Sequence, residues 1–111
     1  MNSYDKAHEL AKSLKEDQIV IEYKNIKEKI KLDKELNDKI ESFKQQRLEL
    51  QLKSMQQGTV DKDLEEKVKK EYQELLSNSL AVEYFEKEVK INVLVSDIQK
   101  IIYEDIKDIL N

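Results

Sequence analysis

The sequence lacks the residues from which most catalytic and metal-binding loops are built. Its 111 residues include no proline, no cysteine, no tryptophan, one glycine and one histidine. Without cysteine, the chain can form neither a disulfide nor a thiolate metal site. With so little glycine and proline, it has little room for a phosphate-binding loop or a strained nucleophile turn. These absences predict a protein that needs no metal, nucleotide or covalent cofactor and that is not an enzyme.

Because His8 is the only histidine, the acidic residues have few ways to take part in a catalytic or metal site. Ser-His-Asp and Cys-His catalysis need an imidazole base, and di-iron sites in helical bundles need two Glu-x-x-His motifs. Asp5 and His8 have the spacing of half such a motif, but the sequence holds no second histidine. We therefore interpret His8 as a surface residue of the first helix. Glutamates and lysines mix at i,i+3 and i,i+4 spacing over residues 65–74, which is typical of a solvated helix face.

Charged residues make up 40% of the chain and hydrophobic residues 39%, with a formal net charge of −4. This mixture is typical of long, charged helices and is too apolar for a disordered chain. The opening residues contain no apolar run that would suggest a signal peptide, and no stretch approaches the roughly 20 apolar residues that span a bilayer. We expect a cytoplasmic protein with no membrane contact. Its negative charge also disfavours nucleic acid as a partner.

Apolar residues recur every three or four positions along almost the whole chain, as in amphipathic helices. Residues that suit helix caps interrupt this pattern. Gly58 suits a C-terminal cap. Five residues suit N-terminal caps: Ser3, Asp17, Asp33, Asp61 and Asn78. The pattern predicts about five helices, with breaks near 15–17, 58–61 and 77–79 and a kink at 32–34. We expect residues 1–111 to form a single all-α domain, an antiparallel bundle with a long last helix over 79–110.

The last helix is too long and too apolar to be covered within a small monomer. A compact chain of this length is about 34 Å across, whereas a helix of about 30 residues is roughly 45 Å long. Its apolar residues fall into two sets, one with Leu94, Ile98 and Ile101 and the other with Val95, Ile102 and Ile106. We predict that the first set serves the monomer core and that the second forms an oligomer interface. The opposite assignment, and a helix buried on all sides within one chain, are the alternatives.

Four lysines suggest an alternative function. Lys24, Lys27, Lys31 and Lys34 share one face if a single helix continues through them, and such a basic stripe can follow a phosphate backbone. No aromatic residues accompany them as a stacking platform for bases. We interpret the stripe as a solvated face and keep direct nucleic-acid binding as the alternative hypothesis.

Several short patterns in the sequence resemble the YlbF/YmcA family of small bacterial helical proteins, and within it the YheA-like branch. The resemblance covers nearly the whole chain and rests on these segments: Tyr4-Asp5-x-Ala7-x-x-Leu10, Phe43 followed by Leu50-Gln51, Met55-x-x-Gly58, Tyr84-x-x-x-Glu88, and Asp97-Ile98-Gln99-Lys100-Ile101-Ile102. These are packing and capping residues, so they indicate a fold more than a function. Three positions depart from the family pattern: Ser79 where proline is frequent, Lys87 where a small residue is usual, and Arg47 where glutamine is frequent.

The resemblance implies an all-α protein that forms dimers or larger assemblies. It also implies a regulatory role, because YlbF and YmcA are accessory factors of the ribonuclease RNase Y in mRNA maturation. Some complexes in the family carry iron–sulfur clusters, but a chain without cysteine cannot supply their usual thiolate ligands. We therefore expect a non-enzymatic interaction protein that binds itself, and a related helical protein or a ribonuclease complex as partner.

Overall fold

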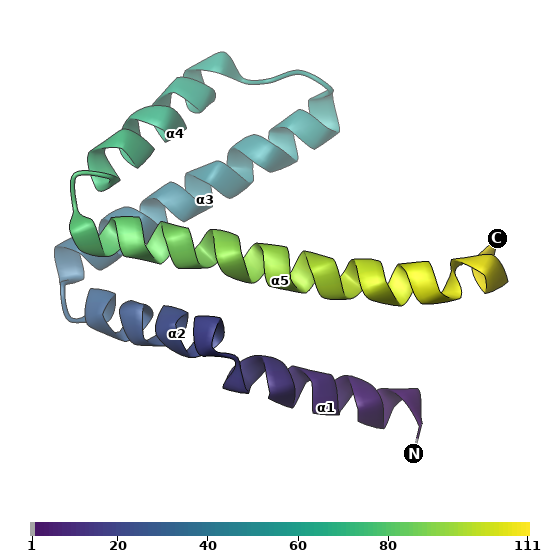
Figure 1. Ribbon diagram of the computed structural model, residues 1–111. Helices are drawn as coiled ribbons and strands as arrows, with labels where there is room; N and C mark the ends of the chain where they lie inside the picture. The colour runs from purple at the N-terminus through teal and green to yellow at the C-terminus, as the bar shows by residue number, and fades with distance from the viewer. Residues whose placement is uncertain (1) are drawn as a thin grey trace. The chain divides into compact units, whose positions relative to one another are not determined.

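The computed structural model describes residues 2–111, which form five α-helices and no strand (Figure 1). The helices are α1 (Ser3–Glu16), α2 (Gln18–Lys31), α3 (Lys34–Gln57), α4 (Lys62–Leu75) and α5 (Ser79–Leu110). The prediction of an all-α chain with a long last helix is confirmed. Each predicted break coincides with a boundary between helices, and the predicted kink at 32–34 is a turn that separates α2 from α3.

Side-chain caps explain why three of the helices start where they do. In each case an Asp or Asn oxygen accepts a backbone N–H of the first helical turn, which has no partner within the helix. The bonds are Leu36 N–H to Asp33 at 3.1 Å, Leu64 N–H to Asp61 at 3.1 Å, and Leu80 N–H to Asn78 at 2.9 Å. All three caps were predicted from the sequence and are confirmed.

The cap of α1 lies one residue earlier than predicted. Asn2 Oδ1 accepts the N–H of Asp5 at 3.0 Å, and Ser3 is already helical, so the prediction that Ser3 caps α1 is wrong. Asn2 and Ser3 are both good caps by residue type, and residue type could not separate them. At the other end of α1, Asp17 has an extended backbone and accepts the N–H of Ile19 at 2.9 Å. A single non-helical residue therefore links α1 to α2.

The contacts divide the chain into two compact units. Unit 1 contains the residues up to Asn25 together with Tyr84–Asn111, and unit 2 contains Ile26–Glu83. Unit 1 thus holds α1, the start of α2 and most of α5. Unit 2 holds the end of α2, all of α3 and α4, and the first turn of α5.

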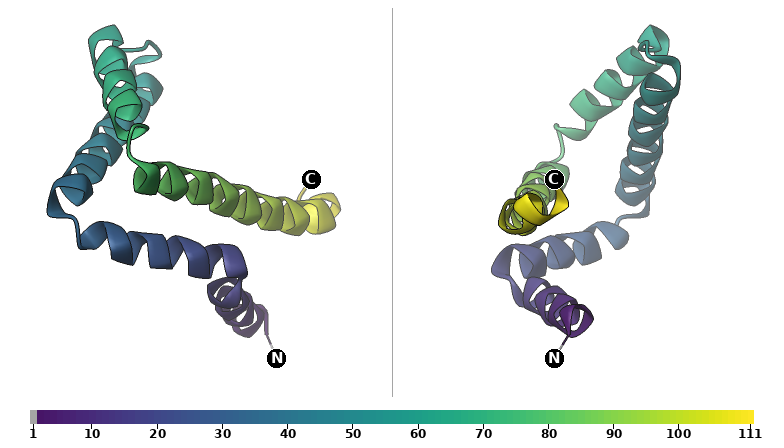
Figure 2. Two further views of the ribbon diagram at one scale, coloured as in Figure 1. Left: turned by 60° about the vertical axis from the view of Figure 1, so that its left-hand side comes forward. Right: turned by 90° about the vertical axis from the view of Figure 1, so that its right-hand side faces the viewer.

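Unit 2 is built on an antiparallel pair of helices, α3 and α4 (Figures 1 and 2). The rings of Phe43 and Tyr72 meet between them, with centroids 5.6 Å apart, and the guanidinium of Arg47 lies 5.3 Å from the Phe43 ring. Most buried hydrophobic side chains of the chain belong to this unit: Ile26, Ile30, Leu36, Ile40, Phe43, Val68, Leu75 and Ala81. Unit 2 therefore carries most of the apolar burial that stabilises the fold.

The tip of the α3–α4 hairpin depends on the one glycine of the chain. Gly58 has a φ of 69°, in the left-handed region, and its N–H caps α3 by donating to the carbonyl of Ser54. A Cβ at this position would meet no atom within 4 Å, so a side chain would cost only backbone strain.

We expect Gly58→Ala to lower the free energy of unfolding by about 1 kcal/mol, because an L-residue in this conformation is strained by roughly 1–2 kcal/mol. Urea denaturation of the full chain measures the change. Gly58→Asn is the matched control and should cost less, since Asn tolerates a left-handed backbone. Equal stability of Gly58→Ala and the parent would contradict this account of the cap.

Candidate interaction surfaces

In unit 1, the contacts between α2 and the start of α5 include an ion pair and a pair of tyrosines. Lys87 Nζ lies 2.6 Å from a carboxylate oxygen of Glu22. The hydroxyl of Tyr23 donates to that of Tyr84 at 3.1 Å, and the two ring centroids are 5.3 Å apart. Tyr84 is buried, so its hydroxyl needs this partner. These contacts fix which side of α5 faces α2.

The ion pair makes part of the stability depend on pH. The hydrogen bond from Lys87 and then that from Gln18 hold the pKa of the Glu22 carboxyl below its ordinary value of 4.5. The folded chain therefore binds this proton less tightly than the unfolded chain does. The stabilisation is complete above pH 4.5 and is lost as the pH falls through the lower folded pKa.

We expect Glu22→Gln to destabilise the chain at pH 7, because glutamine resembles the protonated acid and keeps no charge opposite Lys87. The difference from the parent should shrink below pH 4.5 and vanish at more acidic pH, where the parent's Glu22 is also protonated. Thermal unfolding of both proteins from pH 3 to pH 7 measures this convergence. A difference that is the same at every pH would mean that the charge of Glu22 does not stabilise the fold.

Beyond this contact, α5 carries an apolar stripe that we call the distal face. Its members recur at helical spacing, on the side of α5 that Tyr84 and Lys87 present to α2: Ile91, Leu94, Val95, Ile98, Ile101, Ile102, Ile106 and Ile109. The predicted interface residues belong to it, and they are substantially exposed: Val95 at 38%, Ile102 at 51% and Ile106 at 41%. Single exposed apolar residues are ordinary, but a contiguous stripe marks a surface that another molecule covers.

The first set of apolar residues on α5, which was expected to serve the monomer core, does so only in part. Leu94 and Ile98 are half-buried, but Ile101 is 60% exposed, so the expectation that all three serve the monomer core is wrong for Ile101. At 100° per residue, the two predicted sets lie side by side on one broad stripe rather than on separate faces. The alternative of a helix buried on all sides is likewise wrong for the chain by itself.

The four lysines are exposed but do not all lie on one helix. Lys24, Lys27 and Lys31 belong to α2, whereas Lys34 opens α3 after the turn at Leu32 and Asp33. The helical spacing that was expected to align Lys34 with the others does not continue through that turn. Three lysines on α2 are left as the possible basic face.

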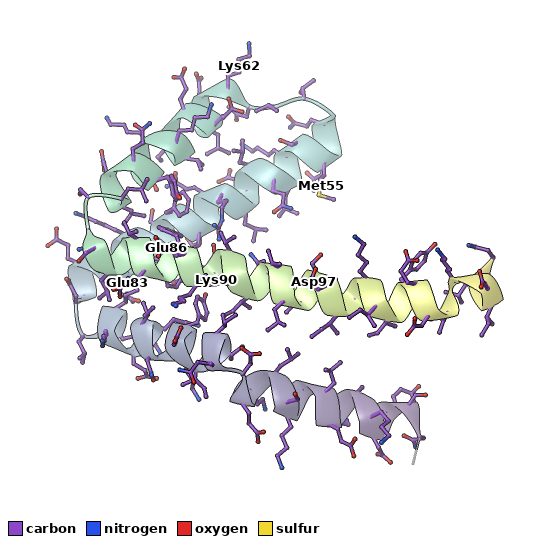
Figure 3. The ribbon with its side chains drawn as sticks, viewed as in Figure 1. Met55, Lys62, Glu83, Glu86, Lys90 and Asp97 are labelled. Atoms are coloured by element: carbon purple, nitrogen blue, oxygen red, sulfur yellow. The ribbon has the colours of Figure 1, made fainter. Side chains whose placement is uncertain are left out.

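A second exposed apolar stripe runs along α3. Leu48, Leu52 and Met55 follow each other at spacings of four and three residues and are all exposed. They do not share the side of α3 that packs on α4, where Ile40 and Phe43 are buried. Met55 lies close to the hairpin tip, on the opposite side of the loop from Lys62 (Figure 3).

An open groove of about 580 Å³ lies between the start of α3 and the end of α4 in unit 2. Its walls are mainly acidic, with Asp33, Glu35, Asp38, Glu71 and Glu74 around the apolar floor formed by Leu36 and Leu75. One of these acids, Glu35, already pairs with Lys39 at 3.2 Å. Sequence reasoning missed this groove because its two walls come from segments far apart in the chain, one ending at Ser42 and the other beginning at Glu71.

Two features are absent from the described residues. No set of three His, Cys, Asp or Glu side chains within residues 2–111 is arranged to hold a metal ion. Over the same residues, no helix combines the length and the apolar character that crossing a bilayer requires. The candidate surfaces of the described chain are the distal face, the apolar stripe on α3 and the acidic groove.

Comparison with known proteins matches residues 3–107 to a family described as control of competence regulator ComK, YlbF/YmcA. That description is of a regulatory role and names no enzymatic activity. A UPF0342 protein of Alkalihalophilus pseudofirmus is 32% identical over 108 residues, covering 97% of this chain and 92% of the relative. Another from Caldicellulosiruptor saccharolyticus is 37% identical over 109 residues, covering 96% and 91%. A third, from Desulfitobacterium hafniense, is 31% identical over 110 residues, covering 99% and 89%.

Proposed function

This chain belongs to the YlbF/YmcA family, and from that membership we propose that it is a cytoplasmic regulatory protein that self-associates and acts by binding other proteins. The regulatory role follows the description of the family. Self-association and the absence of catalysis are our own inferences from the surfaces of this chain.

The exposure of the distal face is the observation that supports self-association. Val95, Ile102 and Ile106 are part of a stripe that extends over several turns of α5 and that the described chain leaves largely exposed. Leaving such a stripe in water forgoes roughly 25 cal/mol for each Å² of apolar surface. A second copy is the partner that is always present at the same concentration as the chain, and symmetric dimers are the commonest assemblies of soluble proteins.

For the regulated partner we propose RNA-processing machinery of the RNase Y type, either the ribonuclease complex itself or a related helical protein in it. The support is the resemblance of this chain to YlbF and YmcA over nearly its whole length. The acidic groove of unit 2 and the apolar stripe on α3 are further surfaces that a protein partner can use.

Two measurements test the proposal. Light scattering of the full chain over a range of concentrations should give a mass at least twice 13.2 kDa. An affinity pull-down from the native cell, scored for RNase Y and for YlbF/YmcA relatives, should recover one of them. A 13.2 kDa monomer at high concentration would refute self-association, and repeated failure to recover these proteins would refute the choice of partner.

The alternative of direct nucleic-acid binding has a separate signature. Phosphate contacts weaken steeply as salt rises, by about 10³–10⁵ in affinity between 50 and 200 mM when six to ten contacts are made. We expect no such binding, given the net charge of −4. The alternative would be favoured by tight, salt-sensitive binding of RNA that is lost in a triple variant. That variant carries Lys24→Glu, Lys27→Glu and Lys31→Glu.

A further inference from the structure

Within residues 2–111, α1 is the only helix without a buried residue. All of its residues are exposed except Leu14, which is half-buried. α2 has the same length of 14 residues, but it buries Ile26 and Ile30. α4, again of 14 residues, buries Val68 and Leu75. Length therefore does not set α1 apart from the other short helices, whereas its lack of tertiary packing does.

The side-chain hydrogen bonds and ion pairs that the described chain gives α1 are all local. Asn2 caps the first turn by accepting the N–H of Asp5 at 3.0 Å. Lys6 pairs with Glu9 at 3.4 Å, and both side chains of this pair are more than half exposed. An exposed pair of this kind stabilises a helix only slightly. In water such local interactions leave a helix of this length marginal, because most helical stability in proteins comes from tertiary packing.

Asp17 separates α1 from α2. Its backbone is extended, with a ψ of 137°, so the helical hydrogen-bond pattern stops there. The N–H of Asp17 donates to the carbonyl of Leu14 in α1, whereas its own carbonyl accepts the N–H of Ile21 in α2. Its carboxylate also accepts the N–H of Ile19. Over the described residues, no backbone hydrogen bond joins α1 directly to α2.

This break determines how α1 folds. A helix that continues from a neighbour gains one hydrogen bond for each residue that is fixed, whereas a separate helix must first form a costly nucleus. We propose that α1 is a conditional helix, which melts and re-forms independently of the rest of the chain because Asp17 uncouples it from α2. The proposal does not depend on self-association, which was inferred from α5.

A conditional helix gives the chain a means of regulation. Any contact that requires a helical α1 is made only by the fraction of chains in which α1 is formed, which lowers the apparent affinity of that contact. A change that favours the helix strengthens the contact without altering the surfaces that meet. Asp17 is the residue that holds this fraction down.

Hydrogen exchange of the full chain, resolved by residue and measured at two protein concentrations, tests the proposal. We expect protection factors below about 100 for amides 7–14 in dilute solution, because α1 opens locally. Amides near Ile40 should be protected at least about a hundredfold more, since they exchange through global unfolding. Low protection in α1 that rises with concentration would also support the proposal, because association would then order the helix. Protection of α1 equal to that near Ile40 at both concentrations would overturn it.

A variant without the break provides a second readout. Asp17→Ala allows α1 and α2 to form one continuous helix, and straightening loses little packing because α1 buries no residue. We expect the protection of amides 7–14 to rise at least about tenfold, since α1 then extends from α2 instead of forming its own nucleus. Ser13→Ala is the matched control, because it introduces the same residue at an exposed position of α1 and keeps the break. Its higher helix propensity alone should raise protection no more than about threefold.

The two variants separate the effect of the break from that of helix propensity. Equal gains in both variants, or no gain in Asp17→Ala, would mean that Asp17 does not uncouple α1 and would overturn the proposal. Amides near Ile40 should keep their protection in both variants, which reports that unit 2 is still folded. The exchange of the parent decides by itself, so the proposal stays testable even if Asp17→Ala folds poorly.

Discussion

Ile102→Glu is expected to dissociate the assembly into 13.2 kDa monomers while leaving the helix content nearly unchanged. Ile102 is 51% exposed in the single chain and lies on the midline of the distal face, so the monomer tolerates a charge there. In the assembly the same carboxylate would be buried without a partner, at a cost of several kcal/mol for each copy. Because a twofold interface contains the substitution twice, we expect the dissociation constant to rise by at least about a thousandfold.

Light scattering gives the mass, and circular dichroism gives the helix content. The matched control is Lys100→Glu, an exposed position on the opposite side of the same helix, which should leave the assembly intact. Ile98→Glu, at a half-buried position of the distal face, should reduce helix content as well as mass. If Ile102→Glu retains the mass of the parent, the distal face is not the interface.

Ile40→Ala is expected to lower the free energy of unfolding by about 2–5 kcal/mol, the range found when a buried isoleucine or leucine is truncated. Ile40 is 2% exposed and lies on the side of α3 that also buries Leu36 and Phe43. Truncation removes apolar contacts and leaves a cavity that rigid neighbours fill only in part. For a small domain stabilised by about 5–15 kcal/mol, this is a large share of the total.

Urea denaturation at a fixed protein concentration measures the change, since the proposed association would also contribute to apparent stability. Leu32→Ala is the matched control, because Leu32 is 89% exposed and its truncation should cost less than about 0.5 kcal/mol. Equal losses at Ile40 and Leu32 would contradict the assignment of Ile40 to the core.

The helices and their ends follow from local sequence signals, which is why they could be predicted. Asp33, Asp61 and Asn78 cap helices because each bonds a backbone N–H two or three residues away, and Gly58 ends α3 because the left-handed backbone favours glycine. Such contacts are encoded within a few residues of sequence. The Asn2 cap of α1 was missed because two adjacent residues are both suitable.

The surfaces follow from contacts between distant residues, and the sequence predicted them less well. Helical spacing identified Val95, Ile102 and Ile106 as apolar positions of α5, but spacing alone could not show that Ile101 is exposed with them. The ion pair between Glu22 and Lys87 and the acidic groove both join residues far apart in the chain. Neither contact can be predicted from a local pattern, because the residues on each side carry no signal of their distant partner.

The uneven distribution of buried side chains has a consequence for hydrogen exchange. Amides near Ile40 and Phe43 should exchange only through global unfolding, whereas those of α1 should exchange through local fraying in the free chain. Assembly through the distal face would slow exchange along the exposed part of α5 and leave the amides near Ile40 and Phe43 unchanged. Dilution alone would then expose the distal face to other partners. Cellular abundance would thus set how much of the regulator is free to engage its target.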